Sequence, residues 1–243
     1  MLQPLLESII FEKASFKDAN NVAPLYIKVF EGHPWYEKLT CNTKFEGCGV
    51  TYVEEKDGPD MNVVNGRSNL FILDGSYDNC KNCDSPLDKT LTNFWEKDNV
   101  VSDYSKATSD NSFIGLLGSK VSKKFFMKKL ELVGFVWGFG VESNTMHNKD
   151  EIANLLVDLS IDPSSTFYHS EIGIDPEFQM KGIGTKFMSA FTDEVRNNGF
   201  SNLIYRTTNT AMIKVYEKLF KNHKELFNDP NPSKDQIWYG VKL

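Results

Sequence analysis

A glycine-containing loop between an expected strand and an expected helix constrains the fold of this chain more than any other segment. Residues 166–174 are rich in aromatic and branched side chains, which is typical of a strand. Asp175-Pro176 then indicates a turn. A helix is expected over 183–196, because four apolar residues recur there at intervals of four: Ile183, Phe187, Phe191 and Val195. This strand–loop–helix order predicts an α/β fold.

The flanking segments continue the alternation of strands and helices. Further strands are expected over 9–11, 113–118, 130–141, 202–207 and 236–241. Helices are expected over 22–30, 91–100 and 150–158, and a last one opens at Asn209. With 243 residues, at roughly 100–200 residues per domain, the chain suits one large domain or a domain with an inserted module.

The loop itself is suited to binding phosphate. Its sequence is Gln179-Met180-Lys181-Gly182-Ile183-Gly184, just before a helix whose first amides have no intrahelical partner. The glycines allow close backbone approach to an anion, and Lys181 adds a positive charge. Its spacing fits neither the dinucleotide fingerprint nor the P-loop. On the residues alone, a simple tight turn is an equal alternative.

Two sequence patterns in this region resemble those of the GNAT family of acetyl-coenzyme A-dependent N-acetyltransferases. The family pattern [Q/R]-x-x-G-x-[G/A] is matched by Gln179, Gly182 and Gly184, after the phrase I-D-P-E-F at 174–178. A second pattern, N-x-x-A-x-x-x-Y-x-K-x-G-F, is matched by Asn209, Tyr216 and Lys218. It departs at Ala211, which is displaced by one position, and at 220–221, where Phe-Lys replaces Gly-Phe.

The resemblance implies a mixed central sheet flanked by helices, and acetyl-CoA as cosubstrate. It assigns the pyrophosphate to the loop Gln179–Thr185 and the pantetheine arm to the preceding strand. The implied coenzyme-binding residues are Ile172, Gly173, Ile174, Gln179, Met180, Lys181, Gly182, Ile183, Gly184, Thr185 and Asn209. The implied reaction is direct transfer of acetyl to a primary amine of a small molecule or a protein. The alternative is a non-catalytic module that senses acyl-CoA or binds a protein.

Two residues are the candidates for catalysis. Tyr216 stands where the family often has the general acid that protonates the departing thiolate. The alternative for Tyr216 is a place in the core stripe of its helix. Glu171 is the first choice for the general base, against an ordinary structural carboxylate. Glu171 and His169 share one face of a regular strand, and a bulge would separate them.

All four cysteines lie in a segment of different texture, residues 41–90. Cys80 and Cys83 form a C-x-x-C-x-x-x-L phrase that resembles a zinc-ribbon knuckle, and Cys41 and Cys48 would complete a tetrahedral zinc site. Free or disulfide-bonded cysteines are the alternative. We interpret 41–90 as an inserted zinc-ribbon-like module in an acetyltransferase domain formed by 1–40 and 91–243. Its role is either to rigidify this segment or to dock a macromolecule.

Charge limits the partners. The net charge is −6, which argues against extensive, sequence-independent binding of nucleic acid. The same charge suits a cationic acceptor such as a polyamine, an aminoglycoside or a lysine-like amine. No apolar run approaches the roughly 20 residues of a membrane span, and the first residues lack a secretory signal pattern. A cytoplasmic location is therefore expected, and assembly as a homodimer is left open.

Overall fold

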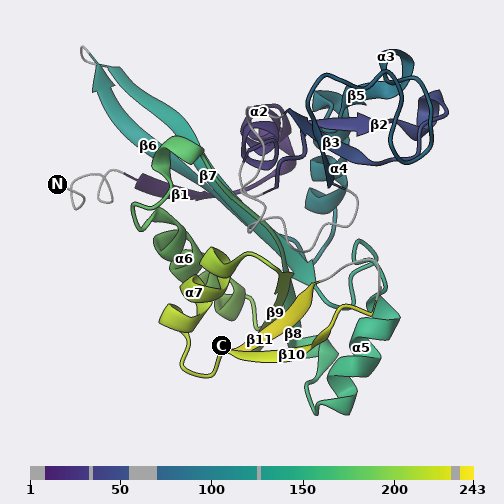
Figure 1. The fold of residues 1–243 in the computed structure, drawn as a ribbon. Helices are drawn as coiled ribbons and strands as arrows, with labels where there is room; N and C mark the ends of the chain where they lie inside the picture. Colours follow the sequence, from purple (N-terminus) through teal and green to yellow (C-terminus); the bar gives the residue numbers. More distant parts are fainter. Residues whose placement is uncertain (1–8, 33–34, 55–69, 125–126, 231–235) are drawn as a thin grey trace.

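The computed structural model describes residues 9–32, 35–54, 70–124, 127–230 and 236–243. Its main body is a mixed seven-stranded sheet in the order β1-β6-β7-β8-β9-β11-β10, flanked by helices (Figure 1). The strands are β1 (Ile9–Lys13), β6 (Ile114–Lys124), β7 (Met127–Gly140), β8 (Thr166–Ile174), β9 (Asn202–Thr207), β10 (Lys224–Asn228) and β11 (Ile237–Lys242). Their neighbours are antiparallel except for the β8–β9 pair, which is parallel.

Helices cover both faces of this sheet. The larger apolar core lies under α6 (Ile183–Asn197) and α7 (Thr210–Leu219). On the opposite face, α2 (Ala19–Phe30) and α4 (Lys97–Thr108) enclose a second core that includes Phe135 and Trp137 of β7. A third cluster lies beneath α5 (Lys149–Asp158). Within the described residues, no helix combines the length and apolar character needed to cross a bilayer.

Strand β8 separates from its parallel partner after three residues. Its pairing with β9 covers only Thr166, Phe167 and Tyr168, whereas its pairing with β7 continues to Ile174. Meanwhile β9 continues to Thr207 and pairs with β11. The sheet therefore opens between β8 and β9 at the end that leads into the glycine-containing loop.

The cysteine-containing segment forms its own small sheet, which stands apart from the main one in Figure 1. Its strand order is β4-β3-β2-β5. The bounds are β2 (Leu39–Cys41), β3 (Thr51–Glu54), β4 (Leu70–Leu73) and β5 (Leu91–Asn93). A short helix, α3 (Leu87–Thr90), lies between β4 and β5 in the chain. This small sheet is inserted between α2 and α4.

Most of the expected elements are confirmed, and β8 and β9 have the bounds predicted from sequence. The prediction that a helix begins at residue 91 is wrong. Leu91–Asn93 instead pair with β2 as strand β5, and α4 begins at Lys97. Tertiary pairing overrides the local apolar spacing there. Strands β2 and β10 were not predicted.

Gly138 of β7 allows β8 to bend where it does. A Cβ atom built on Gly138 would lie 2.0 Å from the carbonyl oxygen of Tyr168, a backbone atom that cannot move aside easily. We expect Gly138→Ala to lower the free energy of unfolding by about 1–3 kcal/mol, measured by urea denaturation. Gly184→Ala is the matched control, because a Cβ at Gly184 meets nothing within 4 Å. Equal stability of the two variants would contradict this role for Gly138.

Candidate active site

The glycine-containing loop presents free helical amides to solvent. Gly182 caps α6 with a φ of 78°, a left-handed conformation that a side chain would strain. Met180 also has a positive φ, 56°, and its side chain is 96% exposed. Above Gly184 there is open space. The first turn of this 15-residue helix can therefore accept an anion at close range.

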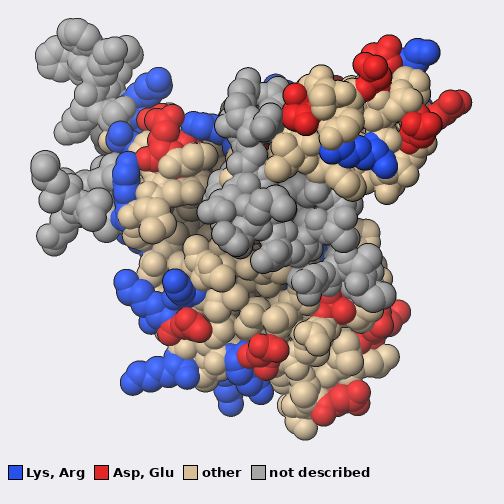
Figure 2. Space-filling view, in the orientation of Figure 1, with Lys and Arg blue, Asp and Glu red and all other residues tan. Residues whose placement is uncertain are grey.

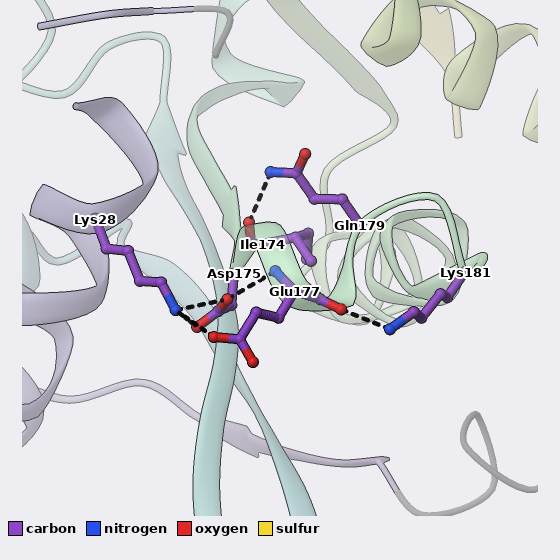
Figure 3. Close-up of polar contacts among 6 residues, drawn as sticks. All are labelled: Lys28, Ile174, Asp175, Glu177, Gln179 and Lys181. Atoms are coloured by element: carbon purple, nitrogen blue, oxygen red, sulfur yellow. Dashed lines mark hydrogen bonds and ion pairs between the residues drawn. The ribbon is translucent and has the colours of Figure 1, made fainter. Parts of the chain in front are cut away.

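Side chains hold the loop in place around this helix start (Figure 3). Gln179 donates its Nε2–H to the Ile174 carbonyl at 3.0 Å. Lys181 Nζ donates to the Glu177 carbonyl at 2.5 Å. The Gln179 side chain thus bridges back to the end of β8, and the Lys181 side chain folds back over the turn at Glu177 and Phe178.

An ion pair joins the loop to the helix on the opposite face of the sheet. Lys28 of α2 lies 2.8 Å from Asp175 Oδ2 and 3.2 Å from Glu177 Oε1, as Figure 3 shows. The hydrogen bond to Asp175 raises the pKa of Lys28, so this ammonium stays charged. Asp175 also accepts the Glu177 amide, which begins the turn after β8. Sequence reasoning did not predict this contact, because Lys28 and Asp175 lie 147 positions apart.

A bulge in β8 sends the two candidate base residues to opposite faces. The register with β7 pairs Trp137 with Glu171 and Gly138 with His169, which leaves Ser170 as the extra residue. After the bulge, Glu171 lines a cavity on the α2 and α4 side together with Ser170. His169 lies on the α6 and α7 side, where its ring contacts Phe191. The nominal parity of a regular strand is therefore broken, and the two side chains do not act from one face.

Tyr216 of α7 is fully buried and bonds to His169. Its hydroxyl lies 2.9 Å from His169 Nδ1, and His169 Nε2 lies 3.2 Å from the Glu171 carbonyl oxygen. A carbonyl can only accept, so the proton of the neutral ring is on Nε2 and Tyr216 donates to Nδ1. Burial lowers the pKa of His169 to about 4 and raises that of Tyr216 well above its ordinary value. Both groups are neutral near pH 7.

Tyr216 is part of a stack of aromatic rings. The rings of Tyr205 and Tyr216 lie 4.0 Å apart and nearly parallel. The hydroxyl of Tyr205 bonds to His223 Nε2 at 2.8 Å, and Tyr239 stacks on both. Sequence reasoning found Tyr216 from its place in a pattern. It missed the stack, because the partners come from separate strands.

The cavity on the other face of β8 has a volume of about 590 Å³. Trp95 of the segment before α4, Tyr104 of α4 and Trp137 of β7 form much of one wall. Tyr168, Arg206 and Trp238 lie together and also line it. The presence of Glu171 among these lining groups makes the cavity a candidate site for a second substrate.

The four cysteines come together at one point. All four sulfur atoms lie within 4.8 Å of one another. The Cys41–Cys83 and Cys48–Cys80 sulfur distances are 3.7 and 3.6 Å. Zinc–thiolate bonds of about 2.3 Å in a tetrahedron place sulfurs roughly 3.8 Å apart, whereas a disulfide needs about 2.05 Å. The donor set and its spacing fit a zinc ion better than disulfides.

The long spacing between Cys41 and Cys48 is accommodated by a tight local turn. A single 3₁₀ turn over Thr43–Phe45 is followed by Gly47, whose absent Cβ would otherwise meet the Cys41 backbone at 2.6 Å. Tyr52 donates its hydroxyl to Cys80 Sγ at 3.0 Å. Such a hydrogen bond to a ligand sulfur is typical of the support around a metal site.

Charge is unevenly distributed on the surface. On the face drawn in Figure 2, Lys and Arg side chains gather over the α6 and α7 side of the main body, whereas the acidic side chains are prominent on the small cysteine-containing sheet. The exposed lysines of α7 include Lys214 and Lys218. The basic region is thus next to the loop that presents free amides.

The other predicted coenzyme residues lie around the opening between β8 and β9. Ile172 and Ile174 pack against the α6 core, and Gly173 faces Phe135 so closely that a Cβ would lie 2.3 Å from its ring. Asn209 caps α7, accepting the Ala211 amide at 2.9 Å. Thr185 belongs to the first turn of α6. These positions are consistent with one elongated site.

The sequence of residues 89–220 matches the model of the acetyltransferase (GNAT) family, and this match spans more than half of the chain. The chain therefore belongs to this family, and the protein is an acyltransferase. The mixed sheet with flanking helices described above confirms the fold expected from the resemblance.

The chain is similar to several solved structures at low sequence identity. The PaiA N-acetyltransferase of Thermoplasma acidophilum, in complex with coenzyme A, is 11% identical, with a TM-score of 0.48, over 97% of this chain and 99% of that chain. A spermidine N-acetyltransferase SpeG chimera from Vibrio cholerae and hSSAT is 11% identical, with a TM-score of 0.49, over 97% and 95%. YncA of Salmonella typhimurium, with acetyl-CoA, is 12% identical, with a TM-score of 0.47, over 97% and 94%. No curated protein sequence matches the chain.

The buried His169 makes stability depend on pH. Its pKa falls from 6.5 in the unfolded chain to about 4 in the folded protein, so the unfolded chain binds the extra proton between these values. Stability is therefore lost as the pH falls below about 6.5. When the pH is lowered from about 7.5 to about 5, we expect the free energy of unfolding of the parent protein to fall by about 2 kcal/mol more than that of His169→Gln. Urea denaturation at each pH measures this difference. Parallel pH profiles of the two proteins would contradict a buried neutral His169.

Proposed function

We propose that this protein transfers acetyl from acetyl-CoA to a primary amine by direct attack. The observation that carries the proposal is the opening between β8 and β9, which begins after Tyr168 and ends at the free amides of α6. An elongated cofactor can lie along this opening, with its pyrophosphate at the helix start. The cavity beside Glu171 adjoins the same strand from the opposite face.

The coenzyme is assigned to the α6 and α7 side. Amides of Gly182, Ile183 and Gly184 would hold the pyrophosphate, with Lys181 as a nearby charge. The backbone of Ile172–Ile174 would pair with the pantetheine arm, since β9 does not pair with these residues. The basic surface over α6 and α7 in Figure 2 favours the anionic end of the same molecule.

The chemistry needs one base and one acid. Glu171 takes a proton from the acceptor ammonium, and the amine nitrogen then attacks the thioester carbonyl carbon. The new C–N bond forms as the C–S bond breaks, and Tyr216 gives its hydroxyl proton to the departing thiolate. The second proton of the attacking nitrogen, lost as the amide forms, restores the Tyr216 hydroxyl, and Glu171 releases its proton to solvent. Burial keeps Tyr216 protonated at neutral pH, as a general acid requires. Its hydroxyl must turn from His169 Nδ1 toward the sulfur in that step.

Tyr216→Phe tests the proposal. We expect kcat for acetyl transfer to fall about 100-fold or more, because the thiolate loses its proton donor. The affinity for acetyl-CoA, measured by calorimetric titration, should stay within about twofold. Thiol release on a panel of primary amines measures kcat.

Tyr205→Phe is the matched control for this variant. It also removes a buried phenolic hydroxyl that bonds to a histidine, but one whose partner is His223. Its kcat should remain close to that of the parent protein. Equal loss in both variants would reject Tyr216 as the acid. No titration signal with acetyl-CoA in the parent protein, or an unaltered signal in Gly182→Val, would reject the assigned coenzyme site.

We infer that Cys41, Cys48, Cys80 and Cys83 bind one structural zinc ion, and that residues 41–90 form an inserted module around it. The sulfur spacing and the Tyr52 hydrogen bond support this assignment. Among the described residues of this segment, the buried apolar cluster is small, and Cys41 and Cys80 themselves take part in it. A metal would stabilise a module of this size.

Zinc content tests this assignment directly. The purified protein should contain about one zinc per chain, and Cys80→Ser should lose most of it, because three thiolates leave the tetrahedral shell incomplete. Ser76→Ala, in the same module but away from the sulfurs, should keep the metal. Four freely titratable thiols in the folded, metal-free parent protein would show the assignment to be wrong.

A further inference from the structure

The cavity on the α2 and α4 face of β8 has strongly aromatic walls. Its volume of about 590 Å³ lies within the range of small-molecule sites, about 300–1,000 Å³. Seven of the residues that line it are aromatic: Tyr26, Trp95, Tyr104, Trp137, Phe139, Tyr168 and Trp238. Aromatic rings bind apolar and planar groups by burial and stacking, and they attract cations to their faces.

These rings are already packed in fixed relative positions. Trp137 lies edge-to-face with Tyr104 at 5.1 Å and stacks with Tyr26 at 6.0 Å. Trp95 meets the edge of Tyr26 at 5.0 Å. Because these contacts already fix the positions of the rings, the side chains lose little conformational entropy when a flat group binds.

Glu171 places an acidic group against this aromatic wall. It is the direct cross-strand partner of Trp137, so the two side chains lie next to each other on the cavity face. An ammonium held by the Glu171 carboxylate would therefore lie beside the indole of Trp137. The remainder of an acceptor would extend along the other rings.

The other charges of the cavity do not suit a polycation. Asp103 pairs with Lys106 at 3.2 Å, and Arg206 pairs with the buried Asp229 at 2.9 Å. Asp229 also accepts the Trp238 indole N–H at 3.2 Å. Two cationic side chains, Lys106 and Arg206, line the same cavity and would repel the further ammonium groups of a polycation. A polyamine or an aminoglycoside would need several carboxylates in addition to Glu171.

Tyr104 contributes its ring to the wall. The residue is 2% exposed, and its hydroxyl, which is closed to solvent, has no hydrogen-bond partner among the described residues. Burial raises the pKa of this phenol, so it remains protonated. The face that Tyr104 offers to the cavity is therefore aromatic and uncharged.

From these features we infer that the acceptor is a monoamine with a large planar or apolar body, bound with its ammonium at Glu171 and its body among the rings around Trp137. This inference rests on the proposed acetyl transfer and names its substrate class. It replaces the polyamine and aminoglycoside classes that the net charge of the whole chain favours.

The test compares four amines in the acetyl transfer assay: tryptamine, 2-phenylethylamine, propylamine and spermidine. We expect kcat/KM for the two aromatic amines to exceed those for propylamine and spermidine by about tenfold or more. Equal or better use of spermidine or propylamine would overturn the inference.

Two variants locate the effect in the cavity. Ala107→Leu fills space on the α4 wall, where Ala107 lines the cavity, and should lower kcat/KM for tryptamine about tenfold while sparing propylamine. Trp95→Leu should do the same, and Trp95→Phe should keep most of the activity because a ring remains. Thermal unfolding midpoints confirm that each variant is folded. Equal losses for tryptamine and propylamine would contradict the assignment.

Direct binding separates this inference from the proposed function. Tryptamine is titrated calorimetrically into the parent protein saturated with coenzyme A, with spermidine as the comparison. Binding of tryptamine that is weakened in Ala107→Leu, without acetylation of any amine, would support the cavity assignment and reject the proposed reaction. Acetylation of spermidine without binding of tryptamine would support the reaction and overturn the acceptor class.

Discussion

Strand β8 is paired on one side only over its second half, and the candidate active site is organised around this part of the strand. Tyr168 is the last residue that β9 pairs with, and the bulge at Ser170 follows immediately. Had the strand continued regularly, Glu171 would share a face with His169 under α6. The extra residue instead directs Glu171 to the aromatic cavity and leaves His169 with Tyr216. The single extra residue in β8 thus places Glu171 on one face of the sheet and His169 on the other.

The two faces are also tied together at the end of β8. Lys28 reaches from α2 to Asp175 and Glu177 and fixes the turn from which the α6 loop departs. The same helix contributes Tyr26, whose ring stacks on Phe135 and Trp137 of β7. Within a single turn, helix α2 therefore contacts the aromatic cavity through Tyr26 and the glycine-containing loop through Lys28. A displacement of α2 would alter both sides of β8 together.

Local sequence was sufficient for features that depend on neighbouring residues. The bounds of β8 and β9 and the glycine loop before α6 could be read from apolar spacing and turn residues. Features that depend on register between distant strands could not. Ser170 becomes a bulge only because Trp137 pairs with Glu171, and Leu91 becomes a strand only because it meets Cys41 of β2. The hydrogen bond from Tyr216 to His169 likewise joins residues 47 positions apart.

Strand β5 connects the cysteine cluster to the aromatic cavity. Cys41 pairs with Leu91 across β2 and β5, and the next contacts along the same ladder are Phe94 N–H to the Lys38 carbonyl and Trp95 Nε1–H to the Glu37 carboxylate, at 2.9 and 2.8 Å. Trp95 then forms part of the cavity wall. A continuous set of hydrogen bonds therefore runs from the cysteine cluster to the aromatic cavity. The small sheet thus supports the α2 and α4 face of β8, where the proposed acceptor would bind.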